Sequence, residues 1–402
     1  MIWLYIITEP VYAARMLIKP PDLRTSLSQL IAAPSVSCTD SNIDTSNQAV
    51  IELLDDWFTH LGFATRIQTV DADAGKYNLI ASCGKGDHGL VLSGHTDTVP
   101  FDDALWSHSP FEMTDRDGRF YGLGIADMKS FFSMILESLS GLDLDALEQP
   151  LIILATCDEE TGMDGARAIA SHGDELGLNN ARYAVIGEPT SLRPVRMHKG
   201  ILMEGIRITG SSGHSSDPSL GVNAMESMHR VITELLRWRE ELQRENRNPM
   251  FEVPVPTMNL GHIHGGDNPN RICGHCELQI DLRPLPGMRV SDLREELHAR
   301  ISRLLAEDRV KLDFIDLFGG IDAVETPAES ELVKYAEELT GCDSEAVAFG
   351  TEAPYFNGMG MESIVLGPGN IEQAHQPDEY LEIARISPYV DKLRELIKRF
   401  CY

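Results

Sequence analysis

Basic residues are scarce in this chain. Lys and Arg together number 34, against 62 Asp and Glu, so the formal net charge is −28. A surface this acidic repels phosphate backbones and the anionic face of a membrane. The composition therefore argues against nucleic acid or a membrane as a partner, and the simplest role of the excess acid is solubility.

Cysteine is also scarce. The chain has seven cysteines, an odd number without regular spacing, which is typical of reduced thiols in the cytoplasm and not of a disulfide framework. Cys273 and Cys276 resemble half of a zinc-binding motif. Because no second pair accompanies them and they lie in a strand-like segment, a structural zinc ion is not expected there.

Long apolar runs are absent as well. No stretch reaches the roughly 18 apolar residues that a membrane-spanning helix needs. The apolar start of the chain is cut short by Glu9 and Pro10, and no basic residue precedes it, so a secretory signal is not expected. We interpret residues 1–21 as an extension that precedes the first domain.

What is present is the composition of a folded protein. Apolar residues make up 43% of the chain and charged residues 24%, which excludes a disordered chain, a coiled coil and a collagen-like repeat. The length of 402 residues suggests two or three domains. Apolar residues recur at helical spacing over 22–33 and 47–61. Short, mainly apolar runs then follow at 89–93, 151–156, 183–186 and 363–366. Such runs are typical of strands buried on both faces, so the pattern predicts an α/β fold with a mostly parallel, helix-covered sheet.

The middle of the chain has a different pattern. Strands are predicted over 201–210, 257–264, 271–283 and 310–317, and helices over 223–243 and 291–306. The resulting order is βαββαβ, a ferredoxin-like unit. We therefore predict an inserted domain over 198–318 that divides a larger domain into two parts, 22–197 and 319–402.

Polar residues follow several of the predicted strands, and one more lies in a glycine-rich loop. They are His95, Asp97, Asp127, Glu159, Glu160, Glu188 and His375. The carboxyl ends of parallel strands meet at one edge of a sheet, so these side chains are expected to lie together. Carboxylates that crowd one place repel each other, and a divalent metal ion would neutralise them. A mixed histidine and carboxylate set suits zinc or cobalt better than calcium or magnesium.

Each of these residues also has an ordinary structural explanation. Asp127 alone would be interpreted as a helix N-cap, and the pair Glu159–Glu160 alone as a solvated acidic turn. Their joint placement at the strand ends is what favours a metal centre.

Five motifs carry a resemblance to a known family. They are GHTDTVP (94–100), GIADMK (124–129), DEETG (158–162), GEPT (187–190) and GHSS (213–216). These motifs resemble the signatures of the M20-type family of co-catalytic zinc peptidases and deacylases, which includes carboxypeptidase G2 and aminoacylase-1. The resemblance covers residues 22–402, with the inserted domain, and does not extend to the first twenty residues.

The resemblance implies two zinc ions per subunit, for which cobalt can substitute. Asp127 would bridge the two ions. His95 and Glu188 would complete one site, and Glu160 and His375 would complete the other.

The resemblance also implies three further roles at this centre. Glu159 would be the general base, and Asp97 would fix the orientation of the His95 ring. His214 would donate to the oxyanion that forms during hydrolysis. The family pairs as a homodimer through the inserted domain, so His214 is expected to reach the metal site of the neighbouring subunit.

A second set of motifs refines the expected substrate. It comprises FDD (101–103), NLGHIHGGD (259–267), NRIC (270–273), LRPLPG (282–287), TEAP (351–354) and AHQPDEYLE (374–382). This pattern is most similar to the family members that remove the acetyl group from N2-acetyl-L-ornithine in arginine biosynthesis. The substrate would thus be a small N-acyl amino acid.

Candidate substrate-binding residues follow from these motifs. Arg283, or Arg271 beside Asn270, is expected to bind the α-carboxylate, since a guanidinium matches a carboxylate. Thr351 and Glu352 are expected near the side chain of ornithine, with the carboxylate of Glu352 facing its ammonium group. Two alternatives remain open: a deacylase of acetylcitrulline, acetylmethionine or succinyl-diaminopimelate, and a non-catalytic binding protein of the same fold, which would be expected to lack Glu159.

Overall fold

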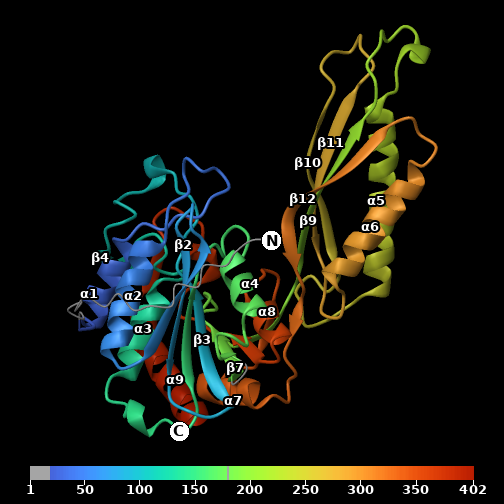
Figure 1. Cartoon of the computed structure of the whole chain (residues 1–402). Helices are drawn as coiled ribbons and strands as arrows, with labels where there is room; N and C mark the ends of the chain where they lie inside the picture. The colour runs from blue at the N-terminus through green and yellow to red at the C-terminus, as the bar shows by residue number, and fades with distance from the viewer. Residues whose placement is uncertain (1–18, 179–180) are drawn as a thin grey trace.

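The computed structural model describes residues 19–178 and 181–402, which form a larger and a smaller body (Figure 1). Most of the predicted N-terminal extension, residues 1–18, lies outside the described residues. Within the described part, no helix combines the length and the apolar character needed to cross a membrane.

A nine-stranded sheet forms the centre of the larger body. Its order is β1-β2-β6-β3-β7-β15-β8-β13, and β14 pairs with β8. The four central strands, β6, β3, β7 and β15, are parallel, whereas β1, β2, β8 and β13 join through antiparallel pairs. The bounds are β1 Ala64–Asp71, β2 Lys76–Cys83, β3 Gly89–His95, β6 Leu151–Thr156, β7 Ala181–Ile186, β8 Val195–His198, β13 Val324–Glu325, β14 Glu345–Val347 and β15 Glu362–Val365.

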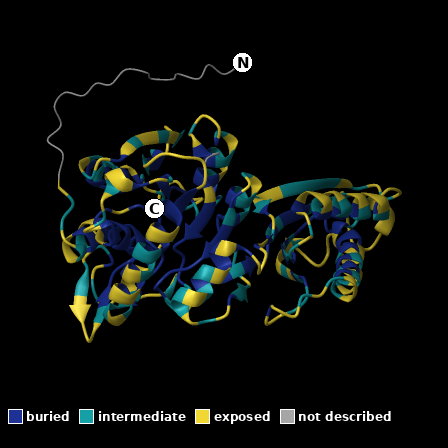
Figure 2. Cartoon of the chain, turned by 90° about the horizontal axis from the view of Figure 1, so that it is seen from below, coloured by how far each residue is buried: buried dark blue, intermediate teal, exposed yellow. Residues whose placement is uncertain are grey.

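Helices cover both faces of this sheet. Every residue of β3 is buried, and successive side chains of the strand enter opposite cores: Leu90 and Leu92 lie in one, and Val91 lies in the other. Helices α1, α2, α3, α7 and α9 pack on the first face, and α4 and α8 on the second (Figure 1). Their bounds are α1 Leu23–Ile31, α2 Gln48–His60, α3 Ser130–Leu139, α4 Asp164–Ser171, α7 Glu331–Thr340, α8 Ala353–Gly358 and α9 Ile383–Cys401. Figure 2 shows the buried residues gathered along this sheet, which confirms the predicted α/β class.

A small sheet joins two distant segments at the rim of the larger body. Its order is β16-β5-β4, with β4 at Thr114–Arg116, β5 at Arg119–Tyr121 and β16 at Tyr380–Glu382. Strand β16 forms the end of the motif at 374–382 that contains His375, and β5 directly precedes the glycine-rich loop that contains Asp127. The antiparallel pairing of Tyr380 with Tyr121 therefore brings these two motifs together.

The smaller body is an antiparallel sheet of order β10-β11-β9-β12 covered by two helices (Figure 1). Its elements are β9 Ile201–Thr209, α5 Ala224–Glu245, β10 Thr257–Gly265, β11 His275–Arg283, α6 Val290–Leu304 and β12 Lys311–Ile321. The predicted βαββαβ order is confirmed. Strand β11 begins later than predicted, and β12 continues to Ile321. The limits 198 and 318 for an inserted domain stay our proposal; β8 ends at His198 and β9 begins at Ile201.

The close approach of the Phe131 ring to Gly187, the residue that follows β7, leads to a prediction about stability. A Cβ atom at this position would lie 2.4 Å from Cγ of the buried Phe131 ring. Gly187→Ala should therefore lower the free energy of unfolding by about 1–3 kcal/mol, because the ring or the backbone must move. Urea unfolding of the metal-free protein measures this change.

Gly358→Ala is the matched control. A Cβ atom there has no neighbour within 4 Å, and the residue ends helix α8. This variant should stay within about 0.5 kcal/mol of the unmodified protein. Equal stability of the two variants would show that the space beside Phe131 adapts without cost.

Candidate active site

The metal-ligand candidates come from five segments that end at one edge of the central sheet. His95 is the last residue of β3, Glu160 follows β6, and Glu188 follows β7. Because β6, β3 and β7 are parallel neighbours, these three residues leave the sheet at the same edge. Asp127 lies in the loop before α3, and His375 lies in the loop before β16.

A first group of ligands is deeply buried. His95 Nε2 lies 3.0 Å from Asp127 Oδ1 and 3.7 Å from Glu188 Oε1. The exposed fractions of the three residues are 1%, 7% and 6%. One ligand atom from each of them lies within 4.8 Å of the others, which is close enough to surround a single ion.

A second group shares Asp127 with the first. His375 Nε2 lies 3.0 Å from Glu160 Oε2 and 3.7 Å from Asp127 Oδ2. The side chain of His375 is 54% exposed, so this group opens to solvent. The two oxygens of Asp127 thus face different histidines, Oδ1 toward His95 and Oδ2 toward His375. This is the arrangement that a carboxylate between two ions requires.

The charges at this edge are not balanced by the protein alone. Burial and the nearby charge of Asp127 raise the pKa of Glu188 well above its usual range, and burial and the same charge raise the pKa of Glu160. Burial opposes the protonation of His95, but the carboxylates of Glu188 and Asp127 outweigh it and raise its pKa. Carboxyl groups that are buried and short of positive charge fit a divalent cation. The donor set of histidine nitrogens and carboxylate oxygens fits zinc or a similar ion.

Asp97 contacts two parts of this centre. Its Oδ1 lies 3.6 Å from His95 Nδ1, and its backbone oxygen lies 3.0 Å from the same nitrogen. The two carboxylate oxygens also accept hydrogen bonds from the backbone N–H groups of Glu159 and Glu160, at 3.3 and 3.1 Å. Asp97 therefore touches the ring that it was expected to orient, and it also holds the turn that carries Glu159, a contact that the sequence did not predict.

Glu159 lies in this turn directly before the candidate ligand Glu160. Burial raises its pKa well above the usual range of a glutamate, and the charge of Glu160 acts in the same direction, whereas His95 opposes it. A carboxyl group with a raised pKa near a metal centre is suited to move a proton at neutral pH.

Sequence reasoning missed the part played by Glu379. This buried carboxylate accepts hydrogen bonds from the backbone N–H groups of Gly124 at 2.9 Å, Ala126 at 2.7 Å and Asp127 at 3.0 Å. It therefore fixes the loop that presents Asp127. Burial raises the pKa of Glu379 to about 8. The signal available in the sequence was its place four residues after His375, but the sequence does not show which backbone it contacts.

Glu352 occupies a different environment from the one expected. Its side chain is 1% exposed, and Oε2 lies 3.3 Å from Ser93 Oγ, inside the body and behind the end of β3. Among the described residues, Oε1 has no hydrogen-bond partner. Thr351 is also buried, and its hydroxyl accepts the N–H of Ala353 at 3.2 Å. The expectation that Glu352 faces a substrate ammonium is not supported by this placement, because the carboxylate has no open surface.

The remaining predicted residues lie on the smaller body, at its two opposite ends. Arg283 ends β11, which pairs with β9 so that Leu282 faces Leu202 near the crossing from the larger body. Its Nε lies 2.9 Å from Asp281 Oδ1.

Asn270, Arg271 and His214 lie together at the other end of the same sheet. They belong to the segments after β9 and before β11, and His275 at the start of β11 faces Thr209 at the end of β9. His214 and Arg271 form an isolated β-bridge, and Asn270 accepts the N–H of Ser215 at 3.1 Å. Figure 1 shows this end of the smaller body pointing away from the larger one. The structure thus brings these three residues together, but not with the metal-ligand candidates of the same chain.

Comparisons with known proteins agree with the motifs. The model of "Peptidase family M20/M25/M40" matches residues 91–399. The chain is 48% identical over 386 residues to a protein of Proteus mirabilis named acetylornithine deacetylase, covering 96% of this chain and 98% of that protein. It is also 48% identical over 384 residues to a protein of Erwinia tasmaniensis with the same name, covering 96% and 99%.

A solved structure shows the same fold. The M20 family metallo-carboxypeptidase Sso-CP2 from Sulfolobus solfataricus superposes with a TM-score of 0.73 at 17% identity, over 95% of this chain and 99% of that one. The region that the family model matches contains His95, Asp127, Glu160, Glu188 and His375. The fold, the motifs and the near full-length similarity agree, and the chain belongs to peptidase family M20/M25/M40.

Proposed function

We propose that this protein is a metal-dependent hydrolase that removes the acetyl group of N2-acetyl-L-ornithine and releases L-ornithine and acetate. One observation carries the proposal: Asp127 is shared by two ligand groups, and the half-buried Glu159 directly precedes Glu160, a member of one of them. The substrate rests on the two relatives named acetylornithine deacetylase, to which the chain is 48% identical.

The residues that would hold the ions follow from the two groups. His95 and Glu188 would bind one zinc ion, Glu160 and His375 the other, and Asp127 would bind both; cobalt would substitute. Two ions bound there would lower the pKa of a water molecule and polarise the substrate carbonyl group.

The protein's own groups would carry the proton. Glu159 would accept a proton from the attacking water and return it to the departing amine, as a general base that then acts as a general acid. Asp97 would hold Glu159 in place through the backbone of the turn. His214 would donate to the oxyanion, and because it lies at the far end of the smaller body, we propose that it does so from the second subunit of a homodimer.

The α-carboxylate of the substrate calls for a guanidinium group. We propose Arg283 for this role, with Arg271 and Asn270 as the alternative from a second subunit. A cytoplasmic location agrees with the seven cysteines, all of which are free thiols in the structure.

Removal of metal from the protein tests the reaction class and the substrate together. Stripped protein should hydrolyse none of a panel of acetylornithine, acetylcitrulline, acetylmethionine and succinyl-diaminopimelate. Zinc or cobalt should restore hydrolysis, with the highest kcat/KM on acetylornithine. Full activity without metal would contradict the metal-dependent mechanism, and preference for another compound would favour the sister deacylases. Metal binding without turnover of any of them would favour a non-catalytic relative.

The neighbouring acids Glu159 and Glu160 are expected to differ in role. Glu159→Ala should lower kcat at least about a hundredfold, the size of a general-base contribution, and leave the metal content nearly unchanged. Glu160→Ala should lower the metal content, since it removes a ligand. Elemental analysis and steady-state kinetics of both variants measure these effects. The opposite result would show that the two roles are exchanged.

His214 gives a test of an active site completed by two subunits. His214→Ala should be nearly inactive and bind metal normally. Mixing it with Glu159→Ala under conditions of subunit exchange should restore activity, because one site in each heterodimer then has Glu159 and the partner's His214. About half of the activity of the unmodified dimer is expected per heterodimer. No recovery in verified heterodimers would rule out action across the dimer.

A further inference from the structure

We propose that Lys76 is a positioning residue for the reaction: its buried ammonium group holds Asp158 and thereby fixes the turn that presents Glu159. The link to catalysis rests on the proposed role of Glu159 as general base. The mechanical part, that Lys76 holds the turn, rests on contacts in the structure alone.

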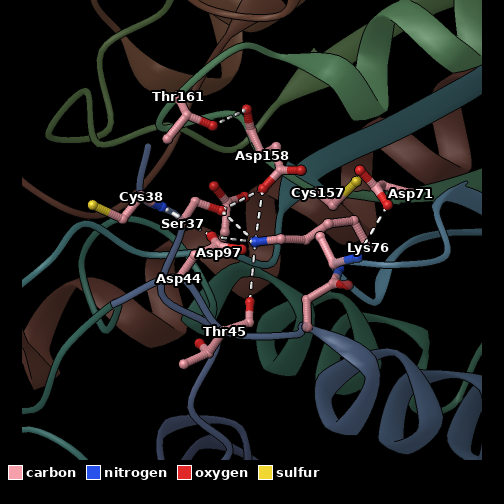
Figure 3. A network of polar contacts seen from close by, with 12 residues as sticks. Ser37, Cys38, Asp44, Thr45, Asp71, Lys76, Asp97, Cys157, Asp158 and Thr161 are labelled. Carbon is pink, nitrogen blue, oxygen red and sulfur yellow. Dashed lines mark hydrogen bonds and ion pairs between the residues drawn. The ribbon is translucent and has the colours of Figure 1, made fainter. Parts of the chain in front are cut away.

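Lys76 is a buried cation surrounded by oxygens. The residue is 3% exposed, and its Nζ lies 2.7 Å from Asp44 Oδ1 and 2.9 Å from Asp158 Oδ1. The same ammonium donates to the backbone oxygen of Thr45 at 3.0 Å and to Ser37 Oγ at 3.3 Å. Figure 3 shows this nitrogen at the centre of the network, with Asp158 on one side and Asp44 and Thr45 on the other. Burial alone would lower the pKa of Lys76, but the two aspartates outweigh it, so the amine stays charged.

The sheet register explains why Lys76 meets Asp158. Strand β2 runs antiparallel to β6, and Leu79 faces Ala155. Lys76 lies three residues before Leu79, and Asp158 lies three residues beyond Ala155. Continuation of the register therefore places the two side by side, just past the end of β6.

Asp158 needs such support because its backbone is unusual. It has a φ angle of 55°, in the left-handed region that residues other than glycine rarely adopt. Its carboxylate accepts a hydrogen bond from Ser37 Oγ at 2.6 Å, in addition to the ion pair with Lys76. Its backbone oxygen accepts the N–H groups of Gly162 and Met163, at 3.0 and 2.6 Å. Both polar parts of Asp158 are thus fixed, and the conformation depends on these contacts.

The turn is consequently held from two sides. Asp97 accepts the N–H groups of Glu159 and Glu160, whereas Lys76 and Ser37 hold the side chain of the preceding residue. If the ammonium is removed, the buried Asp158 and the half-buried Asp44 lose their counter-charge, and the Ser37 hydrogen bond is left to hold the side chain of Asp158. Glu159 would then be displaced without the loss of any metal ligand.

Lys76→Met tests this inference, because methionine keeps most of the apolar stem and removes the charge. The kcat for acetylornithine should fall by about 10- to 100-fold, as expected for a misplaced reacting group, with KM and metal content close to those of the unmodified protein. Hydrogen exchange followed by mass spectrometry gives a readout independent of activity. In metal-free protein, exchange in peptides covering 157–163 should be about tenfold faster, while peptides of β3 should be unchanged.

Three further variants test whether Lys76 affects kcat through its ion pair with Asp158. Lys392→Met is the matched control, because this lysine donates to a single backbone oxygen, that of Leu339, at 2.9 Å in the same body; it should keep the unmodified kcat. Asp158→Asn should reproduce the loss of kcat, and the double variant Lys76→Met with Asp158→Asn should lose no more than either single variant. The double variant also avoids an unpaired charge at position 158, which keeps the test valid if Lys76→Met does not fold.

Two results would overturn the inference: unmodified kcat and exchange in Lys76→Met, or additive losses in the double variant. Failure of the proposed function would look different. The unmodified protein would then not hydrolyse acetylornithine, or Glu159→Gln would stay active. In either case the exchange of 157–163 would still decide whether Lys76 holds the turn.

Discussion

The mutual repulsion of buried carboxylates governs the edge of the sheet where the candidate site lies. Asp127 lies in one ligand group with Glu188 and His95 and in the other with Glu160 and His375. The cost of burying such charges is several kcal/mol each when they have no counter-ion. The rest of the larger body must therefore hold this arrangement against its tendency to open. The required positive charge has to come from bound cations or from lysines brought in from elsewhere in the chain.

Several contacts around the candidate site hold the loop of Asp127 in place. Glu379 accepts hydrogen bonds from three backbone N–H groups in the loop that ends at Asp127, and the pairing of β16 with β5 attaches the segment of Glu379 to this loop. Lys129 lies buried beneath the same loop and donates to the backbone oxygens of Leu30 and Ala33, at 3.0 and 2.7 Å. Burial lowers the pKa of Lys129 to about 7, and both of these contacts are hydrogen bonds to backbone carbonyl groups. The ammonium of Lys76, by contrast, is paired with acids and stays charged.

The sequence predicted the residues whose chemistry is visible in their type and spacing. His95, Glu160 and Glu188 each follow an apolar run, and parallel strands necessarily bring such positions to one edge. The sequence did not predict the contacts of Lys76 or Glu379, because these contacts depend on which strands pair and in which register. Lys76 meets Asp158 only through the antiparallel register of β2 with β6, and nothing in the local pattern of residues 64–83 specified that register. For the same reason the sequence did not predict that Glu352 lies buried behind β3, with its carboxylate 3.3 Å from Ser93 Oγ.

The smaller body extends this argument beyond one chain. The strands of its sheet are long, and the antiparallel register places Leu282 beside Leu202 at one end and His275 beside Thr209 at the other. Residues at the end near the larger body therefore cannot reach the same place as residues at the opposite end. Arg283 is at the first end, and His214 with Arg271 is at the second. A substrate that touched both sets would need the far end of one copy beside the larger body of another. A single chain can assemble the ligand groups alone, but it cannot bring both ends of the smaller body to them in this arrangement. Under the proposed function the two bodies therefore have separate tasks: the larger body holds the acidic centre, and the smaller body would supply residues that contact the substrate.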